Sequence, residues 1–362
     1  MNRQEEEISL KINVTGGGGC GKTRLVITAG EIARQKGWQV DNLTGWSEEL
    51  VSTVGGHFVN FGAPTRENGK RYSYSVWDLG GQVRYADVRK VYLEGTDGLV
   101  CVTDVSRRYT LDILENAMLA KEVRTVCEEN IPIMLVGNKK DLRETLLDSN
   151  TLSQLADALY ERFQSIINDT YVEYSIYVKI GQRKGQQTIR SNVLPLGDKP
   201  ALRVADFEAG VFDVLQTIEA PGFTEMNLKL LAREIWFRLT DKLFSELSGD
   251  KIPYSLLERA SLGAPLFKEF TKDPDVLIPI EWSKDDLRDI LSSTSVSTEE
   301  LHAFSSRLQK EGFNVRHTIE SSAISQENVS ETFERLFQES LEHHKPAETA
   351  DKATAKTQWD EL

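Results

Sequence analysis

The sequence contains little cysteine, no excess of basic residues and no long apolar run. Three of its 362 residues are cysteines, and Cys20, Cys101 and Cys127 lack the spacing of metal ligands; with no secretory signal visible, this is typical of a reducing compartment. The net charge of −13 argues against general nucleic-acid binding and a polybasic membrane anchor. No apolar stretch approaches the ~20 residues that span a bilayer, and no lipidation motif is present. We expect a cytoplasmic protein whose attachment to membranes, if any, depends on partners.

The clearest motif is a glycine-rich loop that fits the phosphate-loop pattern G-x-x-x-x-G-K-[ST]. Apolar residues alternate over residues 8–14, as in a strand, and recur at helical spacing over residues 25–33. A strand, a glycine loop and a helix in this order point backbone N–H groups at an anion. We expect Lys22 to reach the β- and γ-phosphates and Thr23 to bind Mg²⁺. The alternative is a glycine-rich turn before an ordinary helix. The predicted nucleotide-binding residues of the loop are Gly16, Gly17, Gly18, Gly19, Cys20, Gly21, Lys22 and Thr23.

A second motif follows the strand predicted at residues 71–77, which ends in Asp78-Leu79-Gly80-Gly81-Gln82. A carboxylate at the carboxyl end of a strand beside a phosphate loop can hold Mg²⁺, so we predict Asp78 as a metal ligand. The N–H of Gly81 can meet a γ-phosphate, and the amide of Gln82 offers the donor and the acceptor that orient an attacking water. Taken alone, the segment could equally be a tight turn. The predicted catalytic residues are Lys22, Gly81 and Gln82.

A third motif, Asn138-Lys139-Lys140-Asp141, follows a buried strand predicted at residues 131–136. A carboxylate that accepts from both N1–H and the exocyclic amine of guanine rejects adenine. Adenine lacks that pair of donors and would leave a buried charge unpaired. The tetrad therefore predicts guanine recognition through Asn138, Lys139 and Asp141, although alone it could be a lysine-rich surface loop.

Together these motifs resemble the Ras superfamily of small GTPases, in the family's order and roughly its spacing. The run from Trp77 to Gln82 is most similar to the Arf branch, and the run from Gly137 to Arg143 is similar to the Rho or Rab branches, so we assign no subfamily. The resemblance implies an α/β P-loop GTPase fold with a mostly parallel six-stranded sheet flanked by helices. It also implies that the ligands are GTP or GDP and Mg²⁺, and that Gly18 and Gln82 are competent for hydrolysis.

The resemblance leaves two candidates for the threonine of the first switch loop, whose hydroxyl meets Mg²⁺ and whose N–H meets the γ-phosphate. The run that starts at Thr53, Thr-Val-Gly-Gly-His-Phe, is similar to the family's Thr-[Ile/Val]-Gly-x-x-Phe, but it lies further from Lys22 than is usual. Thr44 has the closer spacing and the poorer context. We favour Thr53, as a ligand of both metal and nucleotide.

The last family motif is similar to Glu320-Ser321-Ser322-Ala323, far downstream of the N-K-x-D tetrad. The resemblance implies that Ser322 and Ala323 line the base and that the N–H of Ala323 meets guanine O6. Ile324 takes the place of the lysine that is frequent in the family. The alternative is an ordinary turn at the end of a strand.

The distance between the last two motifs predicts a domain-sized insertion of roughly 150 residues. With 362 residues, 40% of them apolar, the chain can supply two cores. The predicted domains are a first GTPase segment at 1–143, an inserted α+β domain at 144–293, a second GTPase segment at 294–342 and a disordered tail at 343–362.

Apolar periodicity predicts the elements of the insertion and of the second GTPase segment. In the insertion we expect helices near 152–166, 228–243 and 254–272, and strands at 172–180, 188–196 and 201–207. In the second segment, Ser297 and Glu300 form a capping box that opens a helix, and Ser325 is expected to cap the last helix.

Two functions fit these observations. The first is a molecular switch that binds GTP or GDP with Mg²⁺, hydrolyses GTP slowly without an activating partner, and signals through its switch loops and the inserted partner-binding domain. Its expected partners are effectors, an activating protein and an exchange factor. The second is a non-cycling, nucleotide-bound scaffold or adaptor whose insertion carries the interactions. An ATPase is disfavoured by Asn138 and Asp141.

Overall fold

The structure is a computed structural model that describes most of the chain. The described residues are 7–43, 56–63, 71–82, 85–128, 130–146, 148–169, 172–180, 183–191, 201–203, 210–211, 213–217, 227–232, 234–235, 238, 277–279 and 282–344. The chain divides into two compact units. Unit 1 comprises 1–105, 110–140 and 297–362, and unit 2 comprises 106–109 and 141–296.

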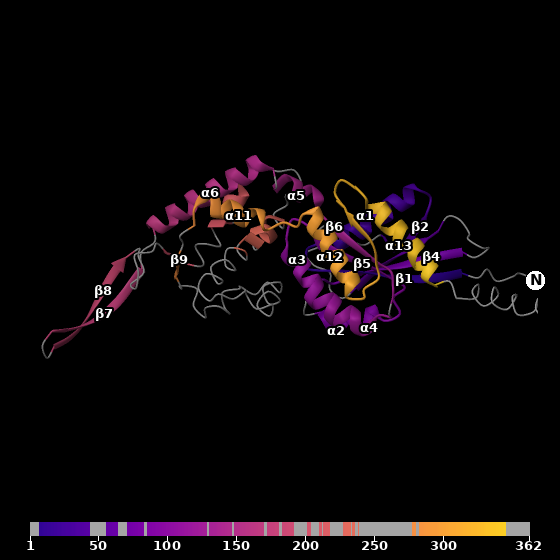
Figure 1. The fold of residues 1–362 in the computed structure, drawn as a ribbon, viewed down its shortest axis with the longest axis horizontal. Coiled ribbons are helices and arrows are strands. Elements are labelled where there is room, and N and C mark those ends of the chain that lie inside the picture. Colours follow the sequence, from indigo (N-terminus) through magenta and orange to yellow (C-terminus); the bar gives the residue numbers. More distant parts are fainter. Residues whose placement is uncertain are drawn as a thin grey trace, which may run out of the picture. The chain divides into compact units, whose positions relative to one another are not determined.

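Within the described residues, unit 1 is built on one seven-stranded sheet (Figure 1). Its strands are β1 Glu7–Gly16, β2 Gln39–Asp41, β3 Gly56–Gly62, β4 Arg71–Leu79, β5 Gly98–Asp104, β6 Ile133–Asn138 and β11 Val315–Glu320. The order is β11-β6-β5-β1-β4-β3-β2, and pairing is parallel except where β3 meets β4 and β2. The predicted P-loop GTPase fold class is confirmed. The strand beyond the six expected is β2, whose three residues are too few to show a period in the sequence.

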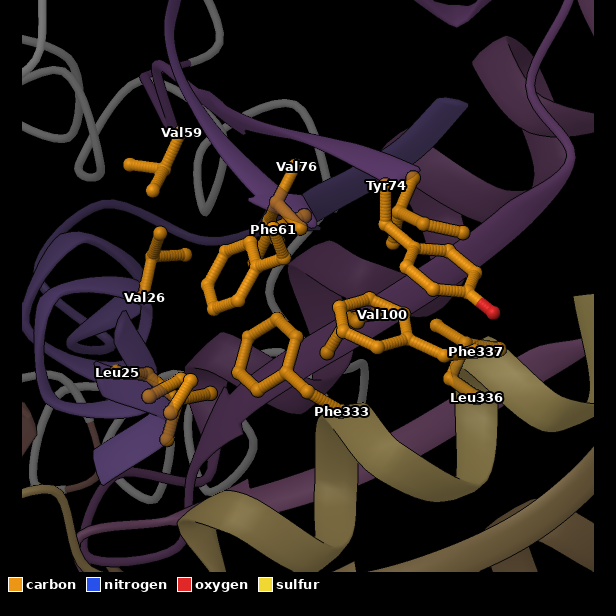
Figure 2. Close-up of a cluster of buried hydrophobic side chains, with 14 of the residues drawn as sticks. Leu25, Val26, Val59, Phe61, Tyr74, Val76, Val100, Phe333, Leu336 and Phe337 are labelled. Carbon is orange, nitrogen blue, oxygen red and sulfur yellow. The ribbon is translucent and has the colours of Figure 1, made fainter. Parts of the chain in front are cut away.

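Helices cover both faces of this sheet. They are α1 Lys22–Gln35, α2 Ala86–Leu93, α3 Tyr109–Ile113, the π-helix η2 Leu114–Val123, α4 Arg124–Val126, α12 Thr298–Lys310 and α13 Val329–His344. Figure 2 shows the core on the α1 and α13 face, where Phe333 and Phe337 of α13 point toward Phe61 of β3 and Tyr74 of β4. Phe337 stacks on Tyr74 with ring centroids 4.0 Å apart. Packing from the last helix therefore holds the strands of the first segment.

Unit 2 has a core of its own. Its described elements are α5 Lys140–Leu146, whose first residue falls in unit 1, α6 Ser149–Asp169, β7 Val172–Ile180, β8 Arg183–Ser191, β9 Ala201–Arg203, β10 Leu277–Pro279 and α11 Lys284–Ser292. Leu155, Leu159 and Phe163 of α6 are buried with Leu287 and Ile290 of α11. These apolar residues recur three and four positions apart, so each helix presents one buried stripe.

Several sequence predictions for unit 2 differ from the structure. The partner of β7 begins at Arg183 rather than at residue 188, and its pairing with β7 starts with Arg183 opposite Ile180. The described part of the strand predicted at 201–207 is Ala201–Arg203, which pairs with β10, a strand that periodicity did not reveal; residues 204–207 lie outside the described residues. The helix predicted at 254–272 lies outside the described residues, as do residues 345–362 of the predicted tail.

The two helix caps predicted for the second segment had different outcomes. The capping box is confirmed: Ser297 accepts from the N–H of Glu300, and the Glu300 carboxylate accepts from the N–H of Ser297. The Ser325 cap is wrong. Helix α13 begins at Val329, and the N–H of Ser325 instead donates to Ser322 Oγ in the preceding turn. Among the described helices we find none with the length and apolarity needed to cross a bilayer.

Candidate nucleotide site

The glycine loop connects the carboxyl end of β1 to the start of α1. Gly19 and Gly21 have φ of 72° and 90°, in the left-handed region that side chains disfavour. Gly16 lies so close to Val102 that a Cβ there would overlap the Val102 carbonyl. The loop therefore needs glycine for both conformation and space, and it brings the amino end of the 14-residue helix α1 to the edge of the sheet.

Lys22 is folded back across this loop. Its Nζ donates to the carbonyl oxygens of Gly16 and Gly17 at 2.9 and 3.0 Å, and only 6% of the residue is exposed. A buried ammonium held by two neutral carbonyls is a strong attraction for an anion at the same place, because it lacks a counter-charge among these contacts.

Thr23 and Asp78 lie together at the edge of the sheet. The Thr23 hydroxyl donates to Asp78 Oδ2 at 2.5 Å, and Asp78 is fully buried. They meet because β1 and β4 pair in parallel, with Val14 opposite Asp78, so both strands end at the same edge. A hydroxyl and a carboxylate are the oxygen ligands that Mg²⁺ prefers, so this pair fits the metal. Thr53 and Thr44, the candidates for a further ligand, lie outside the described residues.

The segment after β4 lies against the glycine loop. A Cβ placed on Gly81 would come within 2.6 Å of the Gly16 carbonyl oxygen and 2.7 Å of that of Gly17, so only glycine fits. The Gln82 side chain lies over Gly18, with its Cγ 3.9 Å from the position of a Gly18 Cβ. Larger side chains at residue 18 would therefore press on Gln82.

The N-K-x-D tetrad is bonded to the same loop. Asn138 Nδ2 donates to the Cys20 carbonyl at 2.9 Å. Lys139 has a φ of 64°, and its Nζ forms an ion pair of 2.9 Å with Asp104 Oδ2. The Lys139 Cε is 3.7 Å from the position of a Gly21 Cβ, so its aliphatic stem lies along the loop. Asp141 directly follows Lys140 as the second, half-buried residue of α5.

The third stretch of unit 1, which begins at residue 297, supplies a wall beside the tetrad, formed by residues 320–323. Strand β11 pairs in parallel with β6, with Glu320 opposite Gly137. The Ser321 N–H donates to the Gly137 carbonyl at 2.8 Å, and the Lys140 N–H donates to the Ser321 carbonyl at 3.1 Å. The Ser321 hydroxyl lies 3.3 Å from Asn138 Oδ1, to which it donates. Residues far apart in the sequence therefore meet at one edge.

The rest of this wall packs on α1. The Thr28 hydroxyl donates to the Ala323 carbonyl at 3.2 Å, and Ser322 is fully buried. Ile324, where the family resemblance leads one to look for lysine, is 64% exposed. The loop that carries Ala323 is thus bonded to α1, the helix that follows the phosphate loop.

The chain is similar in sequence to known proteins. A model described as "Ras family" matches residues 11–180. Ras-related protein Rab-1A of Dictyostelium discoideum is 32% identical over 147 residues, which cover 40% of this chain and 70% of that protein. The chain belongs to the Ras superfamily of small GTPases. Ras-related protein RABA1g of Arabidopsis thaliana is 32% identical over 161 residues (44% and 69%), and Ras-related protein Rab-11A of D. discoideum is 33% identical over 142 residues (39% and 59%).

The family match ends at residue 180, before the wall that β11 carries. In this small GTPase, the pairing of β11 with β6 places the wall beside the tetrad, because the family match does not reach these residues. Of the predicted site residues, the structure brings the glycine loop, Asp78, Gly81 and Gln82 together. It bonds Asn138 to Ser321, which directly precedes the predicted Ser322 and Ala323.

Sequence reasoning missed some polar residues of this small GTPase. Asp104 lies at the carboxyl end of β5 and is fully buried against Lys139. An acid directly after a buried parallel strand is the signal that could have revealed it. Arg89 and Glu122 form a buried ion pair behind Gln82, and nothing in their local sequence marks them as polar partners.

An aromatic cluster lies on β3, β4 and α2. Phe58 of β3 stacks on Trp77 of β4 with ring centroids 4.9 Å apart, and Trp77 lies 5.4 Å from Tyr92 of α2. Lys11 Nζ lies over Trp77, 5.6 Å from the ring centroid. Phe58 remains 40% exposed, so the cluster presents apolar surface to solvent.

Proposed function

We propose that this small GTPase is a molecular switch that binds GTP or GDP with Mg²⁺ and hydrolyses GTP. The observation that supports this most strongly is the meeting of Lys22, the Thr23–Asp78 pair and Gln82 around one glycine loop. An anion site, a metal-ligand pair and a group that can orient water are the parts that phosphoryl transfer to water requires.

The residues divide the work of hydrolysis. Lys22 and the loop N–H groups bind the β- and γ-phosphates, and the N–H of Gly81 donates to the γ-phosphate. The Gln82 amide accepts from and donates to the attacking water, which fixes it in line with the bond that breaks. Thr23 and Asp78 would hold Mg²⁺ together with Thr53, and the metal would neutralise charge that develops on the phosphate oxygens.

Guanine selection follows from the other end of the site. The Asp141 carboxylate accepts from the base N1–H and exocyclic amine, and the Ala323 N–H donates to O6. The Lys139 stem, held by Asp104, packs along the base. A base that lacks the donor pair leaves the Asp141 charge unpaired, which is why the site would favour guanine over adenine.

Signalling would use the surface between the switches. The Phe58–Trp77–Tyr92 cluster is apolar, partly exposed and continuous along β4 with Asp78 of the metal site. A change in the switch segments would alter how a protein effector docks on this cluster. Unit 2 would act as a further partner-binding domain, and its domain limits at 144–293 stay a prediction.

Single-turnover hydrolysis of GTP by the purified full-length chain tests the proposal. We expect measurable turnover that falls at least ~100-fold in Gln82→Leu, because general acid–base and positioning effects of one side chain have that size. GTP that co-purifies and is never hydrolysed would instead favour a nucleotide-bound scaffold, for which the domain-sized insertion is the supporting feature.

A further inference from the structure

Arg89 of α2 is a fully buried arginine whose three side-chain nitrogens all donate hydrogen bonds. Its Nε and Nη2 donate to the two carboxylate oxygens of Glu122 at 2.8 and 2.6 Å. Its Nη1 donates to the carbonyls of Gly80 and Gln82 at 2.7 and 2.6 Å. Arg89 is 1% exposed and Glu122 2%. The guanidinium thus links one carboxylate to two points of the backbone.

The two carbonyls lie on either side of Gly81. The backbone between them carries the N–H assigned to the γ-phosphate and ends at the residue assigned to the attacking water. Because the guanidinium is planar and rigid, it fixes both carbonyls relative to each other. Holding Gly80 and Gln82 in this way sets where the Gln82 side chain points.

The counter-ion comes from an unusual helix. Glu122 belongs to η2, a ten-residue π-helix between α3 and α4. π-helices are rare, and many of them lie at functional sites. The same helix also carries Glu115, whose carboxylate pairs with Arg307 of α12 at the surface. Helix η2 therefore forms two ion pairs. The buried pair with Arg89 reaches the backbone of Gly80 and Gln82, and the pair with Arg307 does not.

Stability alone does not account for the buried pair. Removing two charges from water costs much of what their attraction returns, and an apolar pair of similar volume is often as stable. An apolar pair cannot donate to the Gly80 and Gln82 carbonyls. What distinguishes Arg89 from an apolar residue at this place is its pair of hydrogen bonds to the carbonyls of Gly80 and Gln82.

We propose that Arg89, held by Glu122, is a positioning residue for GTP hydrolysis that acts through Gln82. The inference rests on the proposed function. Arg89 contacts the backbone that carries Gln82 and not the reacting atoms, so its loss should lower the rate of the chemical step and leave nucleotide binding intact. A misplacement of about 1 Å at a reacting group can cost ~100-fold in rate.

The main test is the double variant Arg89→Met/Glu122→Leu, which replaces the pair by apolar residues of similar size. We expect single-turnover hydrolysis to fall about 10–100-fold, with GDP and GTP affinities, measured with fluorescent nucleotides, within about 3-fold of wild type. Arg307→Met/Glu115→Leu is the matched control, because it removes an Arg–Glu pair of the same helix and should leave the rate unchanged. An unchanged rate in the first variant overturns the proposal.

Epistasis with Gln82 separates positioning from general damage. In a Gln82→Ala background, the double variant should slow hydrolysis by less than about 2-fold more, because the group that it positions is already gone. Losses that multiply would show that the pair acts elsewhere and would overturn the proposal.

Stoichiometric GDP binding shows whether the double variant folds. If it does not fold, a second variant tests the proposal. Arg89→Lys keeps the charge but cannot span Glu122 and both carbonyls, and it should lose rate, not affinity. If this variant hydrolyses at the wild-type rate, the proposal fails. If wild type does not hydrolyse GTP, the proposed function and this inference fail together. If its rate depends on Gln82 but not on the Arg89–Glu122 pair, the inference alone fails.

Discussion

The two ends of the nucleotide site are built by the same device over very different lengths of chain. The phosphate half, residues 16–23 and 78–82, lies at the carboxyl ends of the paired strands β1 and β4. The base half, residues 137–140 and 320–323, lies at the carboxyl ends of the paired strands β6 and β11. In both, parallel pairing brings the motifs to one edge. The comparison teaches that strand register, not sequence separation, decides which residues share the site.

The halves also differ in how they hold the nucleotide. The phosphate half offers a buried ammonium and backbone donors to a strongly charged group. The base half is held in shape by neutral hydrogen bonds of Asn138 and Ser321, and only Asp141 would offer a charge to the base. We therefore expect affinity to reside mainly in the first half and selectivity in the second. The following predictions test this division, from the largest effect to the smallest.

Lys22→Ala should weaken GDP and GTP binding by about 100-fold or more, because charge-assisted bonds to both phosphates are lost. GMP, which lacks those phosphates, should bind as weakly to the variant as to wild type. Competition against a fluorescent guanine nucleotide measures all three. A loss in GDP affinity below about 10-fold would contradict the assignment of most of the binding energy to the phosphate half.

Asp141→Asn should change selectivity rather than general affinity. GTP should bind about 100-fold more weakly, while the xanthine nucleotide, which offers an acceptor in place of the exocyclic amine, should bind more tightly. Displacement by GTP and by XTP gives the ratio. Lys22→Ala is the control, since it should lower both affinities by the same factor. A shared loss in Asp141→Asn would remove base reading from this residue.

Ser321→Ala should loosen the base half slightly. It removes the bond from Ser321 Oγ to Asn138 Oδ1, worth about 1 kcal/mol, so GDP should dissociate about 5-fold faster with hydrolysis unchanged. Stopped-flow release of a fluorescent GDP measures the rate. Ser306→Ala, which removes an exposed hydroxyl bonded within α12, is the control and should have no effect.

The smallest expected effect is an acid dependence carried by Glu339 of α13. Burial alone would raise the pKa of this carboxyl, but bonds from Arg316 and His317 of β11 outweigh it and hold the pKa below its usual value. A depressed folded pKa means that the contribution to stability is complete above about pH 4.5 and is lost as pH falls through the folded pKa. Glu339→Gln should flatten thermal stability against pH in that range. An unchanged profile would show that the bonds from Arg316 and His317 to Glu339 do not stabilise the packing of α13 on β11.

The sequence predicted the strand, the glycine loop and the helix of the phosphate half, because these elements follow one another in a short run of residues. Glycines at positive φ, a lysine and a threonine leave a readable pattern from Gly16 to Thr23. The fold class followed from the resemblance to the Ras superfamily, which the three motifs carry in the family's order. Ser297 and Glu300 were also readable, since a capping box joins residues three apart.

What escaped prediction depends on contacts between distant residues. Arg89 and Glu122 are partners only because α2 packs on η2, and Asp104 meets Lys139 only because β5 pairs with β6. Ser325 had the composition of a cap, but the helix begins at Val329, after a turn that Ser322 closes. Local composition cannot decide between such neighbours.

The position of β11 in the chain has a consequence for synthesis. Closing a loop of roughly 180 residues costs only about 1.6 kcal/mol more than closing one of 30, so the finished protein tolerates the detour. A ribosome, however, adds about 5–20 residues per second, so β11 emerges about 10–40 s after β6. During that interval β6 has an unpaired edge in the nascent chain, a template for wrong pairing. We therefore expect the nascent chain to need protection of this edge during translation, as a consequence of where the insertion lies.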